Sequence, residues 1–390
     1  MDFILTPELT FLLGVAVFWI ALYVIAHVFH LDKHGLEVEP AFFMFKSKAL
    51  NSSLDKLANK WRILWKILSN IGLAFSIGLM VFSIYTLTNN LIKLGFLFSF
   101  TTVSQAAPII PLIPVLTIRL YWLPYFFLAV AIIMLSHELA HGIIARLEDI
   151  PILSAGVLAF LLFFGAFVEQ DEKEFEKTSI LSRLRMLGAG SSTNLVIALL
   201  AILLMTGLFI PTPAGVLVQE VTPNSPADKV GLWQWDVIRA INGTPVYAPQ
   251  DFSDYMKKVT PGTAIVLTVL HNNREIIMPV ITEPSQINSS RALLGITTTS
   301  YILNRFGLDQ YTNVNLYWTL SWIQMLGVSV AVFNMLPAFP FDGERVLYYP
   351  LASLVKKRKR ELRWTLNVIV WGLFVLNIAL SLWRFGLFKI

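Results

Sequence analysis

Six long apolar stretches constrain this chain more than any other feature of its sequence. Each is long enough to cross the hydrocarbon core of a bilayer, which takes about 20 apolar residues in a helix. The stretches lie at roughly Leu9–Phe29, Ile63–Thr88, Tyr121–Arg146, Arg185–Phe209, Leu316–Leu336 and Leu362–Trp383. With 56% hydrophobic and 14% charged residues, the composition is far from that of a soluble protein. The sequence therefore predicts a polytopic α-helical membrane protein with about six transmembrane helices.

The distribution of basic residues predicts how these helices are oriented. Lys and Arg crowd residues 33–66 and the run Lys356–Arg360, whereas residues 1–8 contain neither. Because basic loops stay in the cytoplasm, both termini and the loop 210–315 are expected outside the cell. The same rule accounts for the net charge of +5 without nucleic acid as a partner. Trp19, near the end of an apolar run, is expected as an anchor at the membrane interface.

A seventh apolar stretch, Ile152–Val168, is too short for an ordinary transmembrane helix. It contains Gly156 and Gly165 and ends in the acidic letters EQDEKEFE. These features favour a re-entrant hairpin. Irregular backbone at membrane depth is tolerated only where it is buried in protein or lines a cavity. The hairpin is therefore expected to border a functional site.

The polar insert that follows, from about Pro211 to Ser300, has the pattern of a separate α+β domain. Apolar and polar residues alternate, and Asn242-Gly243 and Pro261-Gly262 are typical turn sequences. One amphipathic helix is expected near Pro249–Val259. The insert has roughly 90 residues, which is enough for a domain of its own.

His137, Glu138 and His141 form a metal-binding pattern inside the third apolar stretch. Two histidines four residues apart lie on one face of a helix, about 6 Å apart along its axis, so both can reach one cation. The adjacent Glu138 can deprotonate a water on that cation. Ionisable groups inside a span are costly unless they pair, coordinate a metal or face a water-filled cavity. The pattern predicts a Zn²⁺ site within the membrane, toward its cytoplasmic side.

A catalytic zinc usually takes three protein ligands and leaves one position open. The chain has no cysteine, so the third ligand is expected to be a carboxylate. The candidates are Glu169, Asp171, Glu172 and Asp342. Asp342 follows two helix-breaking prolines, Pro337 and Pro340, and precedes Gly343, which permits a sharp turn. That arrangement could return Asp342 to the histidines.

Two motifs of this chain resemble those of the site-2 protease family of intramembrane zinc metalloproteases. His137-Glu138-Leu139-Ala140-His141 is similar to the His-Glu-x-x-His motif of the family. Asn334, Pro337, Asp342 and Gly343 match its Asn-x-x-Pro-x-x-x-x-Asp-Gly signature. The resemblance covers most of the chain and implies that His137, His141 and Asp342 hold the zinc, with Glu138 as the catalytic base.

The resemblance also gives Asn194 and Asn334 an expected role. Asn194 closes the segment Gly188–Asn194. Many family members have Ala-Gly-Pro in this segment, and this chain has Ser191 in place of the proline. Both amides are expected near the scissile carbonyl, where a donor stabilises the oxyanion. From the residues alone, either amide could instead bridge two helices.

The insert resembles a PDZ domain of the prokaryotic protease type. The matching segments are Ser225–Ala227, Val230–Leu232 and Asp236–Gly243. Gly215, Val216, Leu217 and Val218 are placed in the loop that would bind a peptide carboxylate. PDZ domains accept an extended peptide at a sheet edge, so peptide C-termini are expected partners. The alternative is a domain that binds nothing and acts as a steric plug.

The expected organisation has four parts. Residues 1–120 form N-terminal helices, 121–209 and 301–390 form the catalytic membrane core, and 210–300 form the PDZ domain. The implied activity is cleavage of single-span substrates within the membrane, after a first protease has removed their outer domain. Two alternatives remain: a zinc protease with Glu169 as third ligand that acts on soluble segments, and a non-catalytic PDZ adaptor.

A cluster of histidines at the inner end of the first apolar stretch is not expected to be a second metal site. His27, His30 and His34 lie near Asp32, at a spacing that would permit one. Histidines at the end of a helix near the membrane interface are a commoner arrangement.

Overall fold

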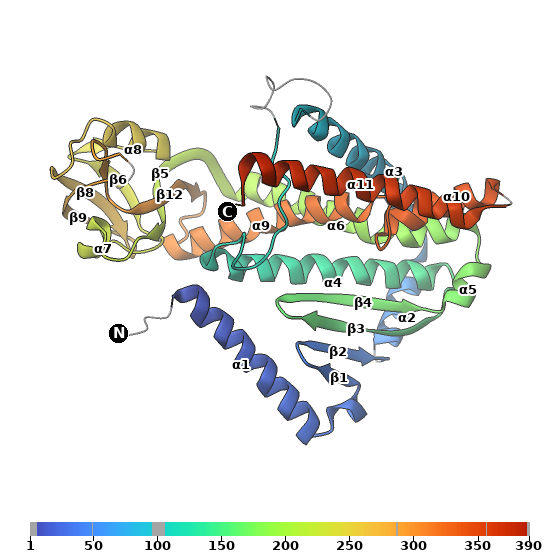
Figure 1. The fold of residues 1–390 in the computed structure, drawn as a ribbon. Helices are drawn as coiled ribbons and strands as arrows, with labels where there is room; N and C mark the ends of the chain where they lie inside the picture. The colour runs from blue at the N-terminus through green and yellow to red at the C-terminus, as the bar shows by residue number, and fades with distance from the viewer. Residues whose placement is uncertain (1–5, 49, 96–105, 286–287, 356, 388–390) are drawn as a thin grey trace. The chain divides into compact units, whose positions relative to one another are not determined.

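Figure 1 shows the computed structural model of the chain, which describes residues 6–48, 50–95, 106–285, 288–355 and 357–387. The chain forms two compact units. One comprises Met1–Leu199 and Ile323–Ile390, and the other comprises Leu200–Trp322. The insert 210–300 lies within the second unit. Two helices, α6 (Ile180–Leu208) and α9 (Gln310–Asn334), continue from one unit into the other.

Six helices of the described chain are long and apolar enough to span a membrane, which confirms the prediction. Besides α6 and α9 they are α1 (Pro7–Val28), α3 (Arg62–Lys93), α4 (Leu123–Leu147) and α11 (Lys359–Phe385). A helix satisfies its own backbone groups, which is what hydrocarbon surroundings require. Local sequence fixes where α1 begins, because Thr6 Oγ1 accepts a hydrogen bond from Leu9 N and Pro7 stands at the first position.

Several short helices connect these spans in the first unit. They are η1 (Leu31–His34), α2 (Leu50–Lys60), η3 (Leu120–Trp122), α5 (Glu172–Lys177) and α10 (Asp342–Leu354). The basic run expected as a topology anchor leads into α11, and its first residue, Lys356, lies outside the described residues. The chain ends, 1–5 and 388–390, also lie outside the described residues.

The predicted hairpin is a pair of β-strands, β3 (Ile152–Phe160) and β4 (Phe163–Gln170). It belongs to an antiparallel sheet of order β1-β2-β3-β4, and the strands β1 (Leu36–Glu39) and β2 (Phe42–Ser47) are not predicted from the sequence. Gly156 is required where β3 passes β2, because an added Cβ would clash with the Phe45 carbonyl oxygen. β4 pairs with β3 and forms one edge of the sheet. This edge lies beside α4 in Figure 1.

Trp19 has a different role from the expected interface anchor. Its side chain is only 7% exposed, and its Nε1 donates a hydrogen bond of 3.0 Å to the carbonyl oxygen of Leu161. Leu161 forms the turn between β3 and β4 with φ of 52°. An unpaired carbonyl in hydrocarbon costs several kcal/mol. The indole therefore satisfies the hairpin turn and ties it to the middle of α1.

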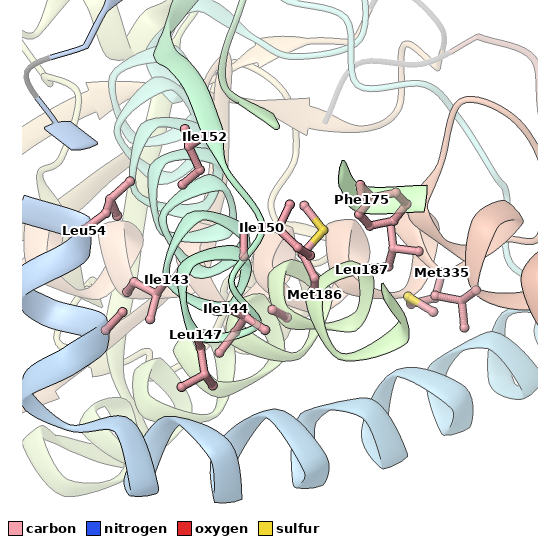
Figure 2. Packing of buried hydrophobic residues seen from close by; sticks show 14 of the residues in the cluster. Leu54, Ile143, Ile144, Leu147, Ile150, Ile152, Phe175, Met186, Leu187 and Met335 are labelled. Carbon is pink, nitrogen blue, oxygen red and sulfur yellow. The ribbon is translucent and has the colours of Figure 1, made fainter. Parts of the chain in front are cut away.

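A buried hydrophobic cluster packs α4 against its neighbours in the first unit. Figure 2 shows Ile143, Ile144 and Leu147 of α4 together with Leu54 of α2 and Met186 of α6. The cluster also includes Leu187, Phe175 and Met335. Because this packing follows directly after His141, it holds the end of the motif-bearing helix in one place.

An ionic cluster holds the C-terminal end of α4. The Glu148 side chain is 5% exposed and accepts hydrogen bonds from Ser182 Oγ at 2.6 Å and Lys66 Nζ at 2.9 Å. Arg185 Nη1 lies 3.2 Å from the same carboxylate. Burial acts to raise the pKa of Glu148, but the bonds from Ser182 and Lys66 and the two cationic charges outweigh it, so the pKa is lowered. Helices α3, α4 and α6 therefore meet at one carboxylate.

The second unit is built on a six-stranded sheet of order β12-β5-β6-β8-β9, with β7 paired to β6. The strands are β5 (Phe209–Val221), β6 (Val237–Ile241), β7 (Thr244–Pro245), β8 (Ala264–His271), β9 (Arg274–Ile281) and β12 (Ile296–Asn304). A second, two-stranded sheet contains β10 (Glu283–Pro284) and β11 (Ala292–Leu293). Two helices complete the unit, α7 (Pro226–Lys229) and α8 (Pro249–Met256), the latter being the predicted amphipathic helix.

Local sequence explains two features of this unit. Asn242 and Gly243 have φ of 48° and 76° and form the turn between β6 and β7, as their sequence predicts. Gln310, at the start of α9, is buried and donates from Nε2 to the carbonyl oxygens of Trp235 at 2.6 Å and Leu270 at 3.2 Å. The sheet is therefore fixed to the first turn of α9.

The Glu148 cluster predicts a pH-dependent contribution to stability. We expect Glu148→Gln to lower the free energy of unfolding by about 1–3 kcal/mol at neutral pH, because the Lys66 and Arg185 charges lose their partner. Since the folded state lowers the pKa of Glu148 from 4.5, this contribution is present above pH 4.5 and is lost as the pH falls through the folded-state pKa. Thermal unfolding of purified protein at several pH values measures the difference.

The exposed Glu176 provides the matched control, and Glu176→Gln should leave the unfolding midpoint unchanged. Equal midpoints for Glu148→Gln and the unaltered protein at neutral pH would contradict a stabilising role for the cluster.

Candidate metal centre

α4 places the two motif histidines on one face, as their spacing predicts. His137 and His141 are 3% and 6% exposed, and their Nε2 atoms lie 3.0 Å apart. Both rings therefore direct a nitrogen lone pair or N–H toward one point beside the helix.

Asp342 lies at that same point although it is 201 positions from His141. Its Oδ2 is 3.3 Å from His137 Nε2 and 3.2 Å from His141 Nε2. The chain leaves α9 at Asn334, turns, and begins α10 at Asp342. Gly343 makes this return possible, because an added Cβ would clash with the Met335 carbonyl oxygen at 2.3 Å.

The three side chains form a donor set that fits zinc. Their ligand atoms lie within 4.8 Å of one another, and no second group of this kind occurs among the described residues. Tetrahedral zinc with ligand bonds of about 2.0–2.1 Å has ligand atoms about 3.3 Å apart. The distances of 3.0, 3.2 and 3.3 Å between the three ligand atoms are close to that value. Two imidazoles and one carboxylate leave a fourth position open, as catalytic zinc sites do.

Glu138 lies beside this group and is held by the edge strand of the sheet. Its Oε2 accepts a hydrogen bond of 2.9 Å from the backbone N–H of Val168 in β4. The predicted hairpin thus borders the site through a specific contact. β4 therefore orients one of the two carboxylate oxygens of Glu138.

The two asparagines occupy different places, whereas the sequence analysis expects both near the scissile carbonyl. Asn334 Nδ2 lies 3.0 Å from His137 Nε2 and 3.4 Å from Asp342 Oδ2, so it faces the ligand atoms. Asn194 Nδ2 lies 3.1 Å from His137 Nδ1, the ring nitrogen outside the ligand group. The fully buried amide of Asn194 thus contacts the other nitrogen of the ring, and its role as an oxyanion donor stays a prediction.

Helix α6 supports both histidine rings from behind. His141 Nδ1 lies 2.7 Å from the carbonyl oxygen of Met186. At Gly190 an added Cβ would lie 2.4 Å from the ring of His137, so only glycine allows this close approach. Met186 and Gly190 are four residues apart and share one face of α6.

The other carboxylates proposed as ligands have different partners. Glu169 accepts a hydrogen bond from Ser154 Oγ at 2.5 Å. Asp171 caps α5 by accepting from Lys173 N at 2.9 Å, and Glu172 pairs with Arg345 at 2.7 Å. The histidines near Asp32 are likewise outside the ligand group, and His27 Nδ1 contacts the Tyr23 carbonyl oxygen at 3.0 Å.

The structure contradicts the predicted peptide-binding loop. Gly215, Val216, Leu217 and Val218 lie in β5, an interior strand between β12 and β6. Gly215 N donates to the Tyr247 carbonyl oxygen and Val218 N to that of Asp236, so these amides are already used. Val216, Leu217 and Val218 are at most 2% exposed.

The second unit instead has a groove between α8 and β12. Its volume is about 390 Å³, and its lining includes Phe252, Ser253, Met256, Leu294 and Ile296. Within the described residues β12 pairs only with β5, so its other edge has no strand partner there. Gly295 lies between the apolar Leu294 and Ile296, and this pattern could have indicated the groove from sequence. Gly215 begins a similar pattern of apolar residues, so the sequence alone does not show which of the two glycines lies at the groove.

Comparisons with known proteins agree with this geometry. The family model described as Peptidase family M50 matches residues 125–378. An uncharacterized protein of Methanocaldococcus jannaschii is 27% identical over 386 residues, with 94% of this chain and 96% of the relative covered. A protein of Clostridium perfringens, named as a candidate zinc metalloprotease, is 26% identical over 297 residues, with 59% of this chain and 88% of the relative covered.

The second unit is similar in structure to the PDZ domain of an SdrC-like protein from Listeria monocytogenes. The sequences are 24% identical, the match covers 23% of this chain and 92% of that domain, and the TM-score is 0.21. Because the family model spans well over half of the chain and includes both metal-binding motifs, the chain belongs to peptidase family M50, the site-2 protease family.

Proposed function

We propose that this protein is an intramembrane zinc endopeptidase that cleaves peptide bonds within the transmembrane segments of membrane-anchored proteins. The observation that carries the proposal is the position of His137 and His141, which form a ligand group with Asp342, on a helix long and apolar enough to span a membrane. His137 is ten residues before the end of α4 at Leu147, which corresponds to roughly 15 Å along the helix. A site at that depth suits a substrate that lies in the bilayer.

The side chains around the ligand group support peptide hydrolysis. Zinc held by His137, His141 and Asp342 would supply Lewis acidity toward water and the scissile carbonyl. Glu138 takes a proton from the attacking water and returns it to the amide nitrogen as the C–N bond breaks. Asn334 Nδ2 faces the ligand atoms, so this amide is placed to donate to the oxyanion.

An apolar cavity that begins about one helical turn before Glu138 favours a membrane-embedded substrate over a soluble one. It has a volume of about 640 Å³ and lies between α1, α4 and the β3–β4 hairpin. Met134 and Leu135 form part of its wall, and Met134 is one turn before Glu138 on α4. A substrate helix in this cavity would therefore lead toward the base.

The free edge of β4 offers a place for the substrate once it has unwound. An intact helix uses its amides in internal hydrogen bonds, so cleavage requires an extended segment. β4 pairs with β3 on one side only, and its Val168 N–H points at Glu138. Substrate helices with Gly, Pro or Asn near the cytoplasmic side should unwind and be cleaved best.

The basic residues at the end of α4 support an active site near the cytoplasmic face. Lys66, Arg146 and Arg185 lie around that end, in the pattern expected of a cytoplasmic boundary. The PDZ domain is then extracytoplasmic, as are both termini. In this arrangement the groove along β12 captures the new C-terminus that a first protease leaves on a membrane-tethered substrate.

Metal content distinguishes this proposal from a zinc protease with a glutamate ligand. We expect Asp342→Ala to lose zinc during purification, because only two ligands remain. Glu169→Ala should keep about one zinc per chain, because its carboxylate bonds to Ser154 instead. Elemental analysis of the purified variants gives the result. Retention by Asp342→Ala and loss by Glu169→Ala would favour the alternative protease.

A variant that lacks the Glu138 carboxylate tests the assignment of this residue as the catalytic base. We expect Glu138→Gln to retain zinc and to lower cleavage of a single-span reporter by roughly 10²–10⁴-fold, because proton transfer is lost. The measurement is gel-based cleavage in lipid vesicles, with two reporters that differ only in a Gly-Asn pair or a Leu-Leu pair near the cytoplasmic end.

Glu176→Gln is the matched control and should cleave at the normal rate. Undiminished cleavage by Glu138→Gln would refute the assignment of Glu138 as the base. No cleavage of either reporter by the unaltered protein would instead favour the non-catalytic adaptor.

Peptide binding tests the proposed role of the groove. The full chain should bind a labelled peptide with an apolar last residue and a free carboxylate at least about tenfold more tightly than its C-terminal amide. Ser253→Trp should abolish binding because the ring fills the groove, whereas Ile277→Trp, on the opposite edge strand, should not. Fluorescence anisotropy measures both. Equal or absent binding of the two peptides would favour the steric plug.

A further inference from the structure

We propose that Asn194 is a positioning residue, which holds His137 in its metal-binding tautomer through the side-chain oxygen Oδ1. The inference rests on the proposed zinc site and assigns a role to a residue on the far side of its ligands. It replaces the expected role of Asn194 as an oxyanion donor.

The Asn194 amide contacts the His137 ring through one of its two polar atoms. The residue is fully buried, and its Nδ2 lies 3.1 Å from His137 Nδ1. Its Oδ1 is buried without a hydrogen-bond partner. A buried carbonyl oxygen without a donor costs about 1–3 kcal/mol, so this position requires an explanation.

The polarity of the contact follows from the chemistry of histidine. Nε2 of His137 belongs to the ligand group, so a ring that binds metal through Nε2 carries its proton on Nδ1. That N–H must donate, and an amide NH₂ cannot accept it. A half-turn of the Asn194 amide exchanges Oδ1 and Nδ2 without a change of shape. Oδ1 then accepts from His137 Nδ1, and the buried oxygen gains its donor.

His141 shows the same arrangement with a backbone acceptor. Its Nδ1 lies 2.7 Å from the carbonyl oxygen of Met186, which can only accept. Met186, Gly190 and Asn194 follow at intervals of four residues along one face of α6. This face therefore provides an acceptor for each histidine and, at Gly190, the space for the ring of His137.

The test uses zinc affinity, which needs no substrate. Competition with a fluorescent chelator is measured for the purified full chain and for Asn194→Ala, Asn194→Asp and Asn334→Ala. Removal of a partner that orients a ligand histidine typically costs 10–100-fold in metal affinity, and we expect a loss of roughly that size in Asn194→Ala. Asn194→Asp can only accept at this position, so its affinity should stay within about threefold of the unaltered protein.

Asn334→Ala provides the contrast between the two amides. It should keep its zinc affinity and lose cleavage rate, whereas Asn194→Ala should lose zinc affinity. The absorption spectrum of the Co²⁺-substituted protein gives a second readout, which should shift in Asn194→Ala and remain unchanged in Asn194→Asp.

Two results would overturn the inference. One is an unchanged zinc affinity in Asn194→Ala, and the other is an equal loss in folded Asn194→Ala and Asn194→Asp. If Asn194→Asp does not fold, the alanine variant alone decides. Failure of the proposed function is distinguishable, because the unaltered protein would then bind no zinc or would cleave no reporter while it binds zinc.

Discussion

The structure depends on bringing Asp342 to two histidines that precede it by about 200 positions. Two imidazoles and a carboxylate in apolar surroundings are costly unless a cation or close partners compensate them. Helix α10 is therefore held on both sides of Asp342. Glu344 is fully buried and accepts from Arg363 of α11 at 2.6 and 2.9 Å. Arg345 pairs with Glu172 at the start of α5, so the first turn of α10 contacts both α11 and α5.

Three different parts of the chain surround the metal-binding face of α4. α6 lies behind the histidine rings, the return from α9 to α10 lies in front, and the edge of β4 reaches Glu138. Two of these approaches are closer than an ordinary side chain would permit. Gly190 and Gly343 provide the space at two of them, because an added Cβ would lie 2.4 Å from His137 and 2.3 Å from the Met335 carbonyl oxygen. The glycines are thus as necessary to the geometry as the ligands.

The sequence predicts structural features that depend on neighbouring residues. It does not predict features that depend on the pairing of distant strands, or on which atom of a side chain makes a contact. Apolar length is enough to find the six spans, and helical spacing is enough to bring His137 and His141 together. Pairing of β2 with β3 joins segments more than 100 positions apart, which no local pattern indicates. A motif names Asn194 but not the ring nitrogen that it contacts. Nor does the Gly215 pattern distinguish an interior strand from an edge strand.

The six-stranded sheet of the second unit is attached directly to the start of α9. Leu217 of β5 and Tyr301 of β12 pack with Val314 and Trp318, which lie in the first turns of α9. Together with the buried Gln310, this packing leaves the sheet without a flexible connection to that helix. A peptide added to β12 would therefore be held at a fixed place relative to the start of a membrane-spanning helix.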